Sequence, residues 1–286
     1  MILSGFTWAL IIFTILTQTA NRILSKQILM TVKPLPLALF ANGAGLIVLL
    51  PFVYKKFGLL GTLDTRLIVL LVGAGIAWAI FGYVYNVALE KSPLSIFTIL
   101  TQLQVILVGF FGFLFLGEAV SLYLWIGILL TCAASVLVSY KKESRKEIGL
   151  SVFLLCMSTA VFGAIAIFLD SYNVHFFDLL LYAWVMMFIS NIPLYFFYRP
   201  TLKDFQVHQL SSYISVGLTF TLSYVLMITL FSQPDANVSY VYPFLRLGAI
   251  AAVFVGIFYF NERTNWKYKI VAILLACLGA VLIKLS

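Results

Sequence analysis

Two stretches of the sequence, 144 residues apart, share one pattern. Residues 112–118 read GFLFLGE and residues 256–262 read GIFYFNE. In each stretch, an aromatic-rich apolar run is followed by a glutamate. The same shift of 144 residues also pairs Ser95 with Ser239. This pattern predicts an internal repeat, in which the chain consists of two similar halves.

The composition around these stretches is that of a membrane protein. Of 286 residues, 63% are apolar and 10% are charged, and the mean hydropathy is +1.09. Soluble globular domains carry about 45–50% apolar and about 25% charged residues. The composition therefore excludes a soluble domain and a disordered chain, and it predicts an all-α membrane protein.

Charged residues, prolines and glycines divide the chain into long apolar runs. Each run is close to the roughly 20 residues that a membrane-spanning helix requires. The ten predicted spans lie near residues 3–24, 35–54, 66–89, 92–116, 122–140, 148–169, 176–198, 209–231, 237–260 and 267–285.

The longest polar stretch, residues 141–147 (KKESRKE), lies near the middle of the chain. We therefore expect a first five-helix repeat over residues 1–140, a linker over 141–147 and a second five-helix repeat over 148–286. Because five is an odd number, the second half is expected to be inverted relative to the first. Inverted repeats are a recurrent transporter architecture, with the substrate site near the midplane between the halves.

The net charge of +8 comes mostly from lysines and arginines between apolar runs, where such residues orient helices and meet lipid head groups. The lipid bilayer is thus an expected partner and nucleic acid is not. The three cysteines lie inside apolar runs without CxxC spacing, so no metal site is expected. Enzyme signatures such as HExxH, G-x-S-x-G and a Walker loop are absent from the sequence. No enzyme activity and no cofactor are therefore expected.

Ten spans in two halves, with a Gly-Glu signature after the fourth span, resemble the EamA-type permeases of the drug/metabolite transporter superfamily. Residues 116–118 (LGE) and 125–127 (WIG) carry the resemblance, with a second copy in residues 260–262 (FNE) and Gly279. Asn261 departs from the glycine that is usual in the family. The resemblance implies transport of small metabolites, which in this family include amino acids, sugars, nucleotide sugars and toxic compounds.

Arg246 is the strongest candidate for a functional residue. It lies near the middle of the ninth span, about 24 Å along a helix from Glu262. A charge at such depth costs at least about 2.5–3.5 kcal/mol, so it should face the bundle interior or a wet cavity. We expect Arg246 to bind a carboxylate or phosphate of the substrate; the alternative is an arginine satisfied by carbonyls and tyrosine hydroxyls.

Helical spacing places further polar residues beside Arg246. Ser239 and Tyr242 share its face, and the 144-residue shift maps this face onto Ser95, Thr98 and Gln102 in the fourth span. Polar residues of the first span and aromatic residues of the third are also candidates. The full set of predicted substrate-binding residues is Arg246, Tyr242, Ser239, Gln102, Thr98, Gln18, Asn21, Trp78 and Tyr83.

Two of these interpretations have alternatives. The first-span residues Gln18 and Asn21 either face the cavity or form hydrogen bonds between helices. Arg22, near the end of the first span, either extends to the membrane interface or provides a second anion contact at the cavity mouth. No Asp or Glu lies in the middle of a predicted span, so the sequence favours uncoupled transport or exchange over a dedicated proton relay.

The predicted function is a secondary transporter in the cell membrane. It would move a small carboxylate-bearing metabolite, such as an amino acid, by alternating access. The alternative substrates are a sugar phosphate, a nucleotide sugar or another organic anion, and the alternative class is a non-transporting receptor or assembly subunit. We expect a monomer or a homodimer. Twelve Lys and Arg residues on one side against four on the other predict external termini, whereas the resemblance implies cytoplasmic ones.

Overall fold

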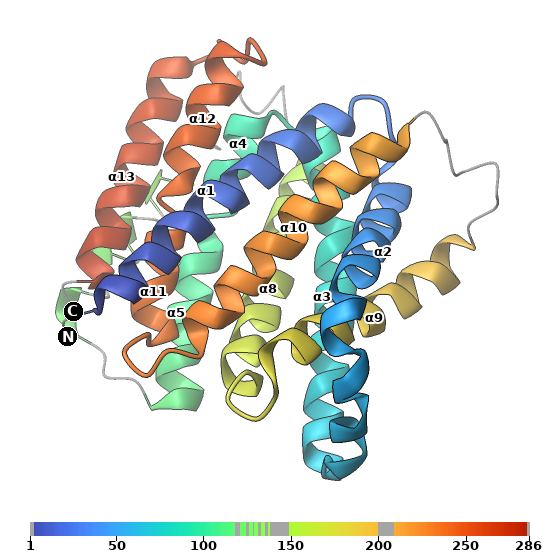
Figure 1. Ribbon diagram of the computed structural model, residues 1–286. Helices are drawn as coiled ribbons and strands as arrows, with labels where there is room; N and C mark the ends of the chain where they lie inside the picture. The colour runs from blue at the N-terminus through green and yellow to red at the C-terminus, as the bar shows by residue number, and fades with distance from the viewer. Residues whose placement is uncertain are drawn as a thin grey trace.

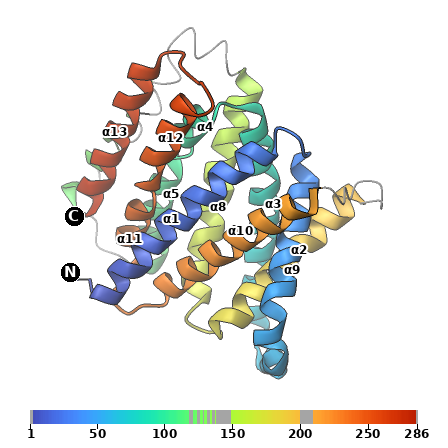
Figure 2. The ribbon, with the colours of Figure 1, turned by 45° about the horizontal axis from the view of Figure 1, so that its top comes forward.

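A computed structural model describes residues 3–117, 121–123, 126–127, 129–130, 133–134, 137, 149–199 and 209–284. Within these ranges every regular element is a helix, and Figures 1 and 2 show them as one bundle. The elements are α1 (Gly5–Ile28), α2 (Pro34–Val53), the 3₁₀ helix η1 (Tyr54–Thr62), α3 (Thr65–Lys91), α4 (Leu94–Leu100), α5 (Leu103–Leu116), α8 (Leu150–Asn173), α9 (Leu179–Tyr198), α10 (Leu210–Phe231), α11 (Val238–Leu245), α12 (Gly248–Phe258) and α13 (Trp266–Lys284).

The helices overlap the predicted spans, although α1 and α8 continue about one turn beyond the predicted ends. Residues 122–140 lie largely outside the described residues. Seven described helical segments are long and apolar enough to cross a membrane. The all-helical membrane fold predicted from composition is thus confirmed. Ten spans in two inverted halves, divided at residues 141–147, stay a prediction.

Polar residues define where several helices begin. The side chain of Ser4 accepts a hydrogen bond from the main-chain N–H of Thr7 at the start of α1. Asp64 does the same for α3, and Asp178 for α9. These caps satisfy N–H groups that have no partner inside the helix, which stabilises a helix by typically about 1 kcal/mol.

The two parts of the sequence interleave in space. α1 packs along α10, α3 along α8, and α2 along both α9 and α10, as the two views show (Figures 1 and 2). Close approach depends on small residues: a Cβ atom added to Gly217 of α10 would lie 2.6 Å from the carbonyl oxygen of Ala41 on α2. Helices from the N-terminal and C-terminal parts of the chain therefore pack directly against each other.

The predicted fourth and ninth spans are each interrupted, which the sequence analysis did not anticipate. α4 ends before Gln102, whose N–H bonds to the carbonyl of Ile99 at 3.1 Å, three residues back. α11 ends before Arg246, whose N–H bonds in the same way to Pro243 at 3.2 Å. Both helices thus change to a tighter turn at positions that the 144-residue shift relates.

Candidate functional site

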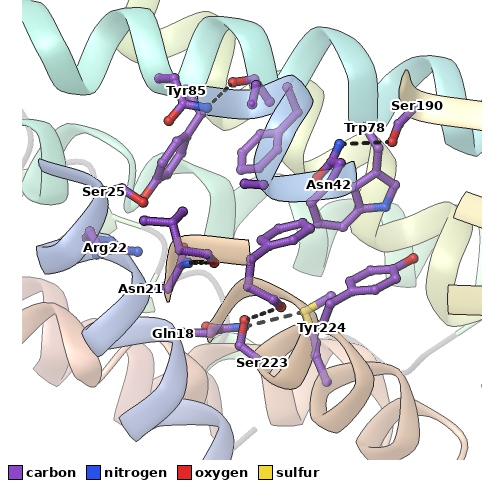
Figure 3. Close-up of a pocket in the computed structure, with 18 of the residues that line it drawn as sticks. Gln18, Asn21, Arg22, Ser25, Asn42, Trp78, Tyr85, Ser190, Ser223 and Tyr224 are labelled. Atoms are coloured by element: carbon purple, nitrogen blue, oxygen red, sulfur yellow. Dashed lines mark hydrogen bonds between the residues drawn. The ribbon is translucent and has the colours of Figure 1, made fainter. Parts of the chain in front are cut away.

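A cavity lies between the helices of the two parts of the chain (Figure 3). Its walls come from α1, α2, α3, α5, α8, α9, α10 and α11, together with Arg246 itself. Its volume is about 140 Å³. A single water needs only about 10–15 Å³, so the cavity has room for a small metabolite.

Arg246 lines this cavity from the break between α11 and α12. Its terminal guanidinium nitrogen donates hydrogen bonds to the side-chain oxygen of Gln104 and to the hydroxyl of Tyr242. The guanidinium carbon lies 4.9 Å from the centre of the Tyr242 ring, a cation–π contact. The Nε atom of Arg246 is buried and has no hydrogen-bond partner among the described residues.

Two glutamines of the α4–α5 segment contact Arg246, one at its main chain and one at its side chain. The amide of Gln102 donates to the main-chain carbonyl of Arg246 at 3.4 Å, while Gln104 holds the guanidinium. Gln104 lies against Gly163 of α8, where an added Cβ atom would collide with the glutamine amide. Gly163 therefore provides the space that Gln104 needs to reach Arg246.

Arg22 lines the same cavity, from α1. Its guanidinium interacts with the hydroxyl of Tyr85 and is near enough to Arg246 for the two positive charges to repel each other. The Nε atom of Arg22 is also buried without a partner among the described residues. Of the two interpretations from sequence, the structure supports a place in the cavity. None of the described lining residues is an aspartate or glutamate, so the cavity is positively charged.

Uncharged polar groups also line the cavity (Figure 3). Asn21 donates to the carbonyl of Val216 and to the hydroxyl of Thr219, both at 3.0 Å. Gln18 contacts the sulfur of Met227 at 3.5 Å. Both interpretations of the first-span residues thus hold for Asn21, which faces the cavity and also connects α1 to α10.

The opposite wall is aromatic. The ring of Trp78 meets those of Phe81 and Tyr224 edge to face, with centres 5.2 Å apart in each pair. Phe220 stacks on Tyr224 at 6.1 Å. All four line the cavity, so it combines a cationic side with an apolar, electron-rich side.

The predicted site residues divide into two groups. Those that line the cavity are Arg246, Tyr242, Gln18, Asn21 and Trp78. Thr98, Gln102 and Ser239 are buried but lie outside the cavity lining, and Tyr83 is 45% exposed on the outer surface. Tyr85, seven residues after Trp78 and hence on the same helix face, occupies the place expected for Tyr83.

Some lining residues were missed by the sequence analysis. Gln104 was not predicted, because a helix that continued without a break from residues 95–102 would not place it beside Arg246. The break at Gln102 changes the helical phase and brings Gln104 to that side. Asn42 and Ser190 lie in mostly apolar runs, with a hydrogen bond of 3.3 Å between their side chains across α2 and α9. The available signal was a polar residue within a mostly apolar run.

The glutamate of the second signature copy has a structural place. The carboxylate of Glu262 accepts hydrogen bonds from the N–H groups of Leu94 and Ser95, the latter at 2.8 Å, and from the Ser95 hydroxyl. It therefore caps α4, where the helix dipole favours a negative charge. The first copy's Glu118, together with Trp125, lies outside the described residues.

The Asn261 departure from the family pattern is also explained. Gly117 has a φ angle of 67° and Asn261, 144 residues later, has a φ angle of 55°. Apart from glycine, asparagine is among the residues that adopt this left-handed conformation most readily. The two copies thus keep the same backbone turn before the glutamate with different residues.

The fold and the cavity define a class of protein: a helical, multi-pass integral membrane protein with a polar chamber between its helices. Residues 1–140 match the EamA-like transporter family, and this half of the chain belongs to that family, within the drug/metabolite transporter superfamily. The chain is therefore a membrane transporter, and the predicted membrane location is confirmed.

A comparison with solved structures extends the fold to the whole chain. A protein crystal structure is similar over 99% of this chain and 98% of its own, with a TM-score of 0.68 and 13% sequence identity. At this identity the likeness shows the fold alone. No curated protein matches the chain significantly.

Proposed function

We propose that this transporter moves a small carboxylate-bearing metabolite, such as an amino acid, across the membrane and that Arg246 binds the carboxylate. One observation carries the proposal: the inter-helix cavity is lined by an arginine whose buried Nε has no partner among the described residues. An arginine keeps its proton, so this donor gains most from an anion. A carboxylate accepts two parallel hydrogen bonds from one guanidinium.

The remaining walls suit the rest of such a molecule. An apolar side chain would pack against Trp78, Phe81 and Phe220, whose rings lie together. No described lining residue is acidic, so an ammonium group would contact side-chain oxygens and ring faces instead of a carboxylate. A substrate that is only a cation would be repelled by two arginines.

Arg22 favours a second candidate, a sugar phosphate, nucleotide sugar or other organic anion. It adds a second positive charge and a second buried Nε without a partner among the described residues. A phosphate, with up to two negative charges, would relieve the repulsion between Arg22 and Arg246 more fully than one carboxylate.

The helix breaks support movement by alternating access. Arg246 and Gln102 stand at the breaks between α11 and α12 and between α4 and α5, at positions related by the 144-residue shift. Two similar halves that rock about such a site would open it to each side in turn. Gln18, Asn21, Trp78 and Tyr242 would contact the substrate with Arg246.

The test is ligand binding to the purified protein in detergent, with probes that share one ring and differ in charge. Benzoate, phenyl phosphate and benzylamine are compared by thermal shift on the wild type and on Arg246→Gln. A ligand at about 100 times its Kd stabilises by about 2.7 kcal/mol. We expect benzoate to stabilise the wild type and to lose at least tenfold in affinity in Arg246→Gln. Arg66→Gln, which alters an exposed arginine bonded to Tyr172, is the matched control.

Each outcome distinguishes a candidate. Stronger binding of phenyl phosphate, with a large loss in Arg22→Gln, would favour the phosphate candidate over the carboxylate. Stabilisation by benzylamine alone would contradict both. Saturable uptake of benzoate into proteoliposomes separates a transporter from a receptor, which would bind the probe without flux.

A further inference from the structure

Asp170 is a buried carboxylate immediately behind the aromatic wall of the cavity. It lies in the last turn of α8 and has no exposed surface. One carboxylate oxygen accepts a hydrogen bond from the indole N–H of Trp78 at 2.9 Å, and the other accepts from the hydroxyl of Tyr182 at 2.6 Å. The predicted sixth span ends at residue 169, so Asp170 was not counted among residues in the middle of a span.

No lysine or arginine among the described residues forms an ion pair with Asp170. The ion pair in the described part of the chain joins Lys56 to Asp178. The helices α4, α5, α9 and α10 carry no charged residue, and those of α3 lie only at its ends. The titratable groups that face Asp170 are the hydroxyls of Tyr182 on α9 and Tyr224 on α10. α3 contributes the indole of Trp78.

This environment supports two charge states. An ionised carboxylate is costly where no cation compensates it, even with two hydrogen-bond donors. A protonated carboxyl group costs far less, and the Tyr182 hydroxyl can rotate to accept its proton. Tyr182 also accepts a hydrogen bond of 3.4 Å from Asn173, a buried residue two positions before the exposed His175.

The charge of Asp170 would be felt inside the cavity. Trp78 lines the cavity while its N–H ends on Asp170, and Ile167, one helical turn earlier on α8, is also a lining residue. An ionised Asp170 would oppose the binding of an anion near Arg246, and a neutral one would not.

We propose that Asp170 binds a proton that is transported together with the anion, which makes the protein a proton–anion symporter. This inference rests on the proposed function, because it takes the cavity ligand to be an anion. The proton adds to a carboxylate oxygen of Asp170 and leaves from the same atom on the opposite side, so one anion and one proton move without net charge. Coupling is reciprocal: protonation tightens anion binding, and the anion promotes proton uptake.

The test measures the affinity for benzoate between pH 5.5 and 8.5. Benzoate itself stays ionised over this range, so a pH dependence would come from the protein. In the wild type, we expect the Kd to rise at least about fivefold toward pH 8.5, the lower end of usual coupling. Asp170→Asn replaces the carboxyl group by an amide of the same shape that cannot ionise. We expect its Kd to stay at the tight, low-pH value throughout.

Asp178→Asn is the matched control. It makes the same chemical change at the start of α9, outside the cavity lining, and asparagine retains the helix-capping ability of aspartate. Its pH dependence should equal that of the wild type. In proteoliposomes, an imposed inward proton gradient should drive benzoate accumulation by the wild type but not by Asp170→Asn.

Three results would overturn the proposal. Benzoate binding that needs Arg246 but does not change with pH would refute proton coupling while leaving the proposed function intact. A pH dependence that persists in Asp170→Asn would assign the proton to another group. Absence of benzoate binding at every pH would refute the proposed function and the symport with it.

Discussion

The side-chain amide of Gln102 donates a hydrogen bond to the main-chain carbonyl of Arg246 at 3.4 Å, and each residue stands at the break of its own helix. The two positions are related by the 144-residue shift, so the contact joins equivalent points of the predicted repeats. It connects α4–α5 to α11–α12 where both segments are interrupted. Gln104, two residues later, contacts the Arg246 side chain instead.

The two glutamines should therefore have separable effects. Gln102→Leu leaves the carbonyl of Arg246 without this donor, and we expect a loss of stability of about 1 kcal/mol with little change in benzoate affinity. Gln104→Leu removes the hydrogen bond to the guanidinium. We expect benzoate affinity to fall at least fivefold, because the arginine loses its fixed orientation. Thermal unfolding and benzoate titration of both variants measure this. Equal effects on affinity would contradict the separate roles.

Replacing Arg246 by lysine tests what the guanidinium contributes beyond its charge. Lysine keeps the positive charge but lacks Nε and the planar pair of donors. A hydrogen bond to a charged group is worth about 1.5–3 kcal/mol, so we expect benzoate affinity to fall at least tenfold in Arg246→Lys. The comparison is with Arg246→Gln, which loses the charge as well and should bind more weakly still. Unchanged affinity in Arg246→Lys would mean that charge alone attracts the ligand.

The cap of α4 by Glu262 predicts a purely structural effect. Glu262→Gln keeps the size of the side chain but removes the negative charge at the helix start, and we expect a loss of about 1–2 kcal/mol of stability. Gly256→Ala should also destabilise the protein, because its Cβ atom would lie 2.7 Å from a carboxylate oxygen of Glu262 and 3.0 Å from the nitrogen of Ser95.

Both cap variants should retain benzoate affinity, measured at a temperature where they remain folded. Neither Glu262 nor Gly256 lines the cavity. A variant that folds normally yet loses affinity would show that the cap acts on the binding site through α4.

Much of the fold follows from composition because apolar length determines where helices can cross a membrane. The breaks at Gln102 and Arg246 could not be predicted in this way, because a tighter turn inside an apolar run leaves the composition unchanged. Pro243 was the one local sign, since a proline inside a helix removes a donor.

The site was predictable where helical phase was sufficient. Tyr85 rather than Tyr83 follows from the seven-residue spacing to Trp78. Arg246 followed from the cost of a charge in a membrane. Asp170 was different: α8 continues to Asn173, one turn beyond the predicted span, and only that extra turn places the carboxylate inside the bundle.

Asp235, in the connection between α10 and α11, predicts a pH dependence of stability. Its carboxylate accepts hydrogen bonds from the main-chain N–H of Ser4 at 2.7 Å and from the hydroxyl of Thr7, and these bonds lower the pKa of Asp235. The contacts fasten the start of α1 to this connection. A lowered pKa means that the stabilisation is complete above the unfolded-state value of about 3.9 and is lost as pH falls through the lower folded value.

Thermal unfolding of the wild type and of Asp235→Asn between pH 6 and pH 3 measures this contribution. The variant should unfold at a lower temperature than the wild type at pH 6, because a neutral amide accepts the N–H of Ser4 more weakly. The difference should shrink toward pH 3, as protonation of the wild-type carboxylate removes the same advantage. Asp64→Asn, at the start of α3 and away from Ser4, controls for a general effect of removing an exposed carboxylate. A difference that stays constant with pH would contradict the assignment of this stabilisation to the ionised form.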